Sequence, residues 1–390
     1  MLKGNVSISR PGVAAVLILQ NAKVQLFSPH RHLQALQTDF PCAIRKKELV
    51  LQNKKRKQME ANSNDEKQTR ALLDNLFEEV KSFRYAKEVR ALFDYCRRMQ
   101  HLSAYNAALV YTQQPGTQLV LTAKQWEKEG RLIKPNSRPL IILLPFGPVG
   151  FVYDICNTEP IQGKDSNEER EQLIERFINH PFTSKENNSS YCSGKIKTLE
   201  YNMPFFGIKY EKMRAGSTLA ANIKGYNDAT IDVPIEKNPR GQTEATIKYG
   251  SRFWVSVNDK AEAAEELASL AHELGHLFCH HLYSREGWWK LRKINENSKE
   301  YEAESAAWLV CSRLGIDSRS AEYLYGYKDD DQIPPVSFES IFTAVNTIEK
   351  MIKGRMSYKE GYLYKYDKEF KQIADAEVAR LKPKHAQGRH

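Results

Sequence analysis

Two histidines four residues apart, with a glutamate after the first, constrain the fold more than any other feature. The segment reads Ala271-His-Glu-Leu-Gly-His276, within an apolar-periodic run over residues 259–281. Positions four apart share one face of a helix, so His272 and His276 can place two imidazole nitrogens on one metal ion. Glu273 is rotated by about 100° from His272 and can act on a water at that metal without being a ligand. This is the H-E-x-x-H arrangement of zinc peptidases.

The same run separates an apolar arc from a chemical face, on which His272, His276 and His280 lie to one side of the arc. Asp259 and Glu262 have the spacing of a capping box, which predicts that the helix begins at Asp259. This separation favours a metal site over a chance pattern on a surface helix. The arc consists of Leu267, Leu270, Ala271, Leu274, Leu277 and Phe278.

A second helix, predicted over residues 298–314, offers the third ligand. The alternative, a third histidine six residues after the second, is excluded because that position is Leu282. Glu300 and Glu304 lie one turn apart on one face of the second helix, whereas Glu302 points well away from Glu300. We therefore predict that Glu300 is the third ligand and that Glu304 orients a ligand histidine. Glu302 is predicted to be a solvated surface carboxylate.

These residues resemble a known family of metallopeptidases. His272-Glu-Leu-Gly-His276 followed by Glu300-Tyr-Glu-Ala-Glu304-Ser-Ala-Ala is similar to the ImmA/IrrE family, whose second helix carries E-x-E-A-x-x-x-A. The family usually has Asn or Asp where this chain has Glu304. The run Trp308-Leu-Val-Cys-Ser-Arg-Leu-Gly-Ile316 is closer to ArdC-like antirestriction proteins, in which a related peptidase domain follows a domain that binds single-stranded DNA. The resemblance implies a zincin-like fold that holds Zn²⁺.

Length and cysteine usage predict a cytoplasmic protein of two domains, and the order of predicted helices and strands predicts the α+β class. A chain of 390 residues can form two cores. The longest apolar run, residues 13–19, is too short to span a membrane, so no membrane partner is expected. The six cysteines are scattered without C-x-x-C pairs, which indicates a reducing compartment. Cys279, close to His276, can be taken for a ligand, but we expect a small buried residue.

The basic charge is concentrated at the start of the chain. Residues 1–60 hold 11 Lys/Arg against 3 Asp/Glu, whereas the rest holds 47 against 45. Residues 1–62 are predicted to be a disordered basic extension, in which Lys54-Lys-Arg-Lys57 is a nucleic-acid patch or a solvated charge run. The further predicted segments are a small α+β ArdC-like domain (63–160), a connecting segment (161–227), an ImmA/IrrE-like metallopeptidase domain with the H-E-x-x-H helix beside a small sheet (228–355), and a C-terminal helix and tail (356–390).

The segment 63–160 resembles the ArdC-type amino-terminal domain in the order of Asn106, Trp126 with Gly130-Arg131, and an apolar strand that ends at Pro145. The resemblance implies binding of single-stranded DNA through these residues, with Trp126 stacking on a base and Arg131 meeting a phosphate. The alternative is that they are packing residues of the domain core.

Together, these features predict a zinc-dependent metalloendopeptidase that cleaves a cytoplasmic protein or peptide substrate, such as a regulator. His272, His276 and Glu300 would hold Zn²⁺, and Glu273 would be the catalytic base. Two alternatives remain: an antirestriction-type DNA-binding protein whose metal site is structural, and a regulator-cleaving protease whose first domain binds protein and not DNA.

Overall fold

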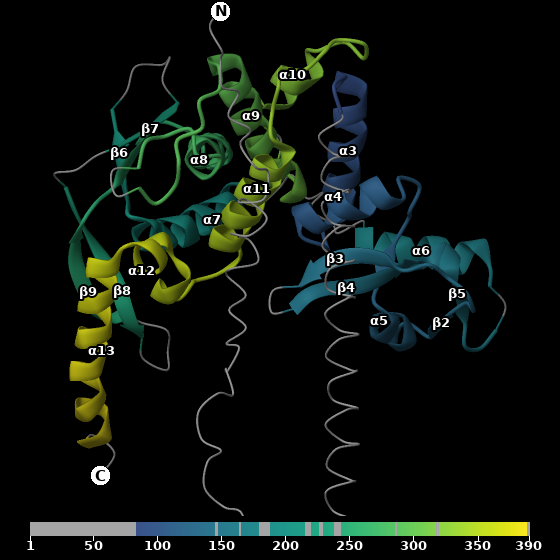
Figure 1. The fold of residues 1–390 in the computed structure, drawn as a ribbon, viewed down its shortest axis with the longest axis horizontal. Coiled ribbons are helices and arrows are strands. Elements are labelled where there is room, and N and C mark those ends of the chain that lie inside the picture. The colour runs from purple at the N-terminus through teal and green to yellow at the C-terminus, as the bar shows by residue number, and fades with distance from the viewer. Residues whose placement is uncertain are drawn as a thin grey trace, which may run out of the picture. The chain divides into compact units, whose positions relative to one another are not determined.

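The described part of the chain forms two compact units of helices and small sheets (Figure 1). The computed structural model describes residues 83–144, 147–163, 165–178, 188–214, 220–225, 229–237, 243–284, 287–316, 318 and 320–387. One unit is formed by residues 120–163, and the other by residues 83–119 with 165–387. The predicted α+β class is confirmed. The predicted extension over 1–62 lies outside the described residues, and the domain boundaries stay predictions.

The first unit holds two small antiparallel sheets around one short helix. Strands pair in the orders β1-β4-β3 and β2-β5. The helix begins at a capping box in which Thr122 and Gln125 bond reciprocally. Its Trp126 is fully buried in the unit's core. The elements are β1 (Val120–Leu121), α5 (Ala123–Lys128), β2 (Arg131–Ile133), β3 (Leu140–Leu144), β4 (Gly147–Asp154), η1 (Ile155–Asn157) and β5 (Thr158–Pro160).

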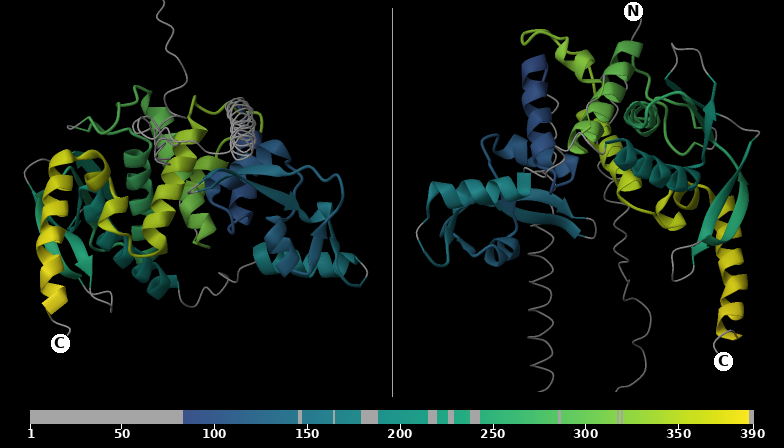
Figure 2. Two further views of the ribbon diagram at one scale, coloured as in Figure 1. Left: turned by 60° about the horizontal axis from the view of Figure 1, so that its bottom comes forward. Right: turned by 180° about the vertical axis from the view of Figure 1, so that it is seen from behind.

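The second unit is built on helices that pack around α8 (Ala263–Phe278) and α9 (Glu296–Arg313). Helix α11 (Phe338–Lys353) contacts both of them, and the three lie side by side (Figure 2). The other helical elements are α3 (Ala86–Arg98), α4 (Ala104–Gln113), α6 (Asn167–Ile178), α7 (Asn188–Asn202), η3 (Met203–Phe206), α10 (Ser320–Tyr325), η4 (Tyr358–Glu360), α12 (Tyr362–Tyr366) and α13 (Lys368–Gln387). No helix of the described residues is both long and apolar enough to cross a bilayer.

Helices α3 and α4 belong to this second unit, although the sequence groups them with the strands of 120–160. Phe93 of α3 stacks on Trp308 of α9, with ring centroids 6.0 Å apart. The buried Arg313 guanidinium of α9 donates to the backbone carbonyls of Cys96, Met99 and Leu102, at and just beyond the end of α3. The carbonyls left open where a helix ends are thereby satisfied.

A three-stranded sheet lies against α8. Its order is β6-β10-β7, with β10 (Phe253–Asn258) parallel to β6 (Ile208–Met213) and antiparallel to β7 (Ala221–Gly225). A separate antiparallel pair consists of β8 (Thr230–Lys237) and β9 (Thr243–Gly250). The predicted small sheet beside the H-E-x-x-H helix is present, but of the strands after residue 228 only β10 belongs to it. Strands β6 and β7 were not predicted.

Helices α8 and α9 cross closely because Gly275 has no side chain. A Cβ on Gly275 would come within 3.1 Å of the backbone of Ala303. The predicted start of α8 at Asp259 is wrong: the N-cap is Glu262, and it makes no side-chain capping bond. Helix α9 begins at Glu296, where the Asn295 side chain accepts from Ser298 N at 2.8 Å. The crossing brings the polar faces of both helices together.

Candidate metal centre

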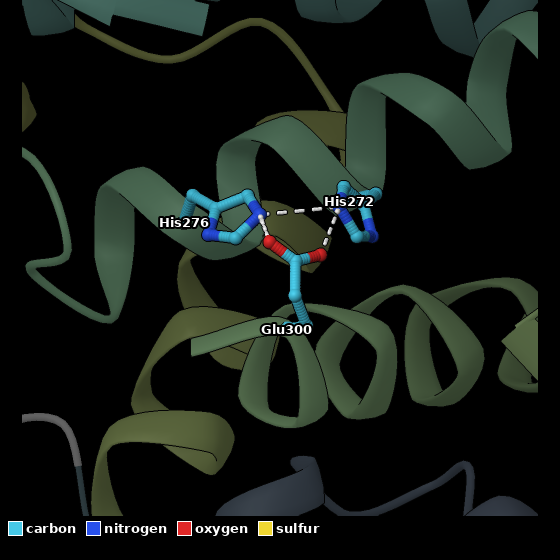
Figure 3. A group of neighbouring side chains, drawn as sticks. All are labelled: His272, His276 and Glu300. Carbon is cyan, nitrogen blue, oxygen red and sulfur yellow. Dashed lines mark hydrogen bonds and ion pairs between the residues drawn. The ribbon is translucent and has the colours of Figure 1, made fainter. Parts of the chain in front are cut away.

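Two histidines of α8 and one glutamate of α9 converge on a common point (Figure 3). The Nε2 atoms of His272 and His276 lie 3.1 Å apart. Glu300 Oε2 lies 3.6 Å from Nε2 of His272, and Oε1 lies 3.5 Å from Nε2 of His276. Tetrahedral zinc, with bonds of about 2.0–2.2 Å to nitrogen and oxygen, separates its donors by roughly 3.3–3.6 Å. The three residues, called the open cluster below, therefore fit a metal ion.

Glu304 lies behind His272, as predicted from the spacing. Its Oε1 is 3.5 Å from Nδ1 of His272, on the side of the ring opposite the open cluster. Burial alone would lower the pKa of His272, but the bond to Glu304 and the nearby carboxylates raise it above its ordinary value. A carboxylate behind a ligand histidine holds the ring and strengthens it as a donor.

Glu273 is held between α8 and the edge of the sheet. Its carboxylate accepts a hydrogen bond from the backbone N–H of Ile223 in β7. Burial raises the pKa of Glu273, while the two histidines and the Ile223 N–H act in the opposite direction. A carboxyl group with a raised pKa beside two donor histidines is suited to accept and return a proton.

The prediction for Glu302 is wrong, because its side chain is completely buried. It accepts from Nη2 of Arg292 at 2.7 Å, from Ser337 N at 2.7 Å, and from Nε2 of His281 at 2.8 Å. Burial would raise the pKa of Glu302, but the bonds from His281 and Arg292 lower it. The face of α9 that carries Glu302 packs against the segment before α9 and the start of α11, and a helical period alone does not reveal this second contact.

A second group of metal-ligand types lies next to the first but is already occupied by a cation of the protein. Cys279, His281 and Glu302, called the closed cluster below, are all buried, with their donor atoms within 4.8 Å of one another. The guanidinium of Arg292 binds Glu302 through two nitrogens and also donates to the Cys279 carbonyl at 3.1 Å. Burial raises the pKa of the Cys279 thiol well above its usual value, so it stays protonated. The expectation that Cys279 is buried is confirmed.

Comparison with known proteins adds one similarity. No family model matches the sequence, and no curated protein matches it. The chain is similar to the metal-free crystal structure of the antirestriction protein ArdC from the R388 plasmid, with 14% identity and a TM-score of 0.27, over 64% of this chain and 81% of that one. A TM-score of this size establishes no common fold. The resemblance to the ImmA/IrrE family stays a prediction, and the geometry of the site carries the conclusions below.

Two of the three residues predicted to meet DNA are used in packing. Trp126 is fully buried and donates its indole N–H to the Tyr153 carbonyl at 2.8 Å, so its ring faces are not available to a base. Arg131 is 4% exposed and donates to the hydroxyl and the carbonyl of Thr158. Asn106 lies on α4, in the other compact unit. The packing alternative therefore describes Trp126 and Arg131, and DNA binding stays a prediction without a described site.

Sequence reasoning missed His281 and Arg292. The signal for His281 was its place five residues after His276, at the end of the predicted apolar-periodic run. The signal for Arg292 was weaker. Several basic residues lie between α8 and α9, and the sequence does not indicate which of them binds Glu302. Only the burial of Glu302 selects Arg292, because a buried carboxylate needs a cation or several hydrogen-bond donors.

Proposed function

We propose that this protein is a zinc-dependent metalloendopeptidase in which Glu273 is the general base. One observation carries the proposal: the open cluster contributes three donors from the described residues, and a further carboxylate outside it, that of Glu273, is held beside it by the sheet. Structural zinc sites use four protein ligands, whereas catalytic sites use three and leave one position open. His272, His276 and Glu300 would hold the ion.

The residues around the ion divide the chemistry between them. When bound there, Zn²⁺ supplies a Lewis acid that polarises a carbonyl and acidifies a water molecule. Glu273 takes the proton of the attacking water and returns it to the nitrogen of the leaving amine. Glu304 keeps the ring of His272 facing the site. The Ile223 N–H of β7 anchors the Glu273 carboxylate.

The sheet supports an extended protein or peptide substrate. Strand β7 contacts α8. It is an edge strand of the described sheet, in which it pairs with β10 alone. An edge strand presents backbone N–H and C=O groups that pair with an extended segment. Because Ile223 belongs to this strand and also holds Glu273, a segment paired with β7 would run past the general base. We propose a cytoplasmic setting, since the described cysteines are all free thiols.

The test is cleavage of a proteome-derived peptide library, read by mass spectrometry, with zinc content measured on the same samples. Glu273→Gln keeps the size of the side chain but cannot take a proton, so we expect a loss of about 10²–10⁴ in rate with zinc retained. Glu262→Gln removes the same charge from the exposed start of α8 and should cleave like the wild type. A Glu273→Gln variant that keeps wild-type cleavage would refute the proposal. Stoichiometric zinc without any cleavage by the wild type would favour the antirestriction-type alternative with a structural metal.

A further inference from the structure

A chain of buried hydrogen bonds leads away from the metal side of His276. Nδ1 of His276 lies 3.0 Å from Nδ1 of His281, and Nε2 of His281 lies 2.8 Å from Oε2 of Glu302. The side chains of His281 and Glu302 are 1% and 0% exposed. Water therefore cannot replace either side chain as a hydrogen-bond partner. Each of these two hydrogen bonds needs one donor and one acceptor among the three residues.

The direction of the hydrogen bonds follows from Glu302. Its carboxylate accepts from the guanidinium of Arg292 and from Ser337 N, so it is ionised and can only accept. His281 must then donate through Nε2. A second proton on His281 would place an imidazolium in a buried cluster that already holds the Arg292 guanidinium, and like charges disfavour this. His281 is thus neutral, and its Nδ1 accepts.

The consequence for His276 is a fixed tautomer. Because Nδ1 of His281 accepts, Nδ1 of His276 carries the proton and donates it. Nε2 of His276 is then free of hydrogen, and this is the atom that faces His272 and Glu300 (Figure 3). We infer that His281 is a positioning residue, which with Glu302 behind it holds His276 in the tautomer that binds the metal ion.

The two ligand histidines have different hydrogen-bond partners behind their rings. His272 faces the carboxylate of Glu304 directly, and that side chain is 23% exposed. His276 faces a neutral imidazole, with the carboxylate one residue further away and completely buried. The inference rests on the metal site of the proposed function but not on peptidase activity, so it can be tested without a substrate.

A matched pair of variants at position 281 isolates the acceptor. Asn and Leu have nearly the same shape, and both remove the bond to Glu302. His281→Asn places a carbonyl oxygen where Nδ1 lies, so it can still accept from His276, whereas His281→Leu cannot. Zinc affinity is measured on the full chain by competition with a chromophoric chelator. The tautomer of His276 is read in the metal-free protein from its imidazole ¹⁵N shifts.

We expect His281→Leu to bind zinc about 10–100-fold more weakly, the usual cost of losing an outer contact to a ligand, and His281→Asn to stay within about threefold of the wild type. The metal-free wild type and His281→Asn should show the proton on Nδ1 of His276, and His281→Leu should move it to Nε2. Equal zinc affinities for all three proteins, or equal losses in both folded variants, would overturn the inference. If the zinc-loaded wild type cleaves no peptide but the variants differ in zinc affinity as expected, only the proposed function is overturned.

Discussion

The open and closed clusters take their residues from neighbouring parts of the second unit. Each combines histidine from α8 or the residues just after it with one glutamate of α9. In the open cluster, the half-exposed carboxylate of Glu300 faces two imidazoles. In the closed cluster, the buried carboxylate of Glu302 faces the Arg292 guanidinium. Residue type alone therefore does not define a metal site, because a fixed protein cation can already neutralise the same donors.

The largest expected effect is on stability, from removing the carboxylate of the closed cluster. Glu302→Ala removes the buried acceptor of both the part-buried Arg292 guanidinium and the buried His281 ring, which should cost about 3–5 kcal/mol of the free energy of unfolding. Glu300→Ala, measured in the same urea titration with a chelator present, should change it by less than about 1 kcal/mol, as is usual at a partly exposed position. Similar losses for both variants would mean that the clusters are not distinct.

Zinc affinity should depend on the open cluster and not on the closed cluster, the reverse of the order expected for stability. Glu300→Gln removes a direct donor and should weaken zinc binding by about 100-fold or more, since losing even an outer contact costs 10–100-fold. Cys279→Ala removes the thiol of the closed cluster and should leave zinc affinity unchanged within about twofold, because the protonated Cys279 is not a ligand. Chelator competition on both variants checks this. Weaker binding by Cys279→Ala than by Glu300→Gln would move the ion to the closed cluster.

A smaller effect concerns the pH dependence of stability near Arg292. Burial, with help from Arg292 and His281, lowers the pKa of His280 to about 4. In the unfolded chain His280 is protonated at about pH 6.5, whereas in the folded chain it is protonated only at about pH 4. The unfolded chain therefore binds one more proton between these pH values, and stability falls as the pH decreases through this range. His280→Asn tolerates the left-handed backbone (φ 62°) and should reduce that fall by about 2 kcal/mol. Urea titrations of the metal-free proteins at pH 7 and pH 4.5 measure it, and an unchanged fall would contradict the assignment.

The sequence was sufficient for the open cluster because its geometry is local. Four-residue spacing places His272 and His276 on one face of α8, and the same rule selects Glu300 and Glu304 on α9. The closed cluster depends on contacts that no single helix specifies, since Arg292 comes from the segment between the helices and Ser337 N from the start of α11. The strands β6 and β7 were missed for a related reason. They are short, and β6 acquires its partner β10 only across some forty residues of intervening chain.

The residues expected to contact DNA show a different limit. Trp126 and Arg131 are types that bind nucleic acid when exposed and stabilise a core when buried. Trp126 is buried and bonds to Tyr153 of strand β4, and Arg131 bonds to Thr158 across the β2-β5 pair. Residue type indicates both roles equally well, and only burial in the folded unit decides between them.

X-ray absorption spectroscopy of the zinc-loaded protein tests the central claim most directly, because sulfur belongs only to the closed cluster. We predict that zinc in the open cluster shows nitrogen and oxygen neighbours at about 2.0–2.2 Å, including two imidazoles, and no sulfur. A sulfur neighbour at about 2.3 Å would place the ion on Cys279. That result would contradict both the assignment of His272, His276 and Glu300 and the role given to Arg292.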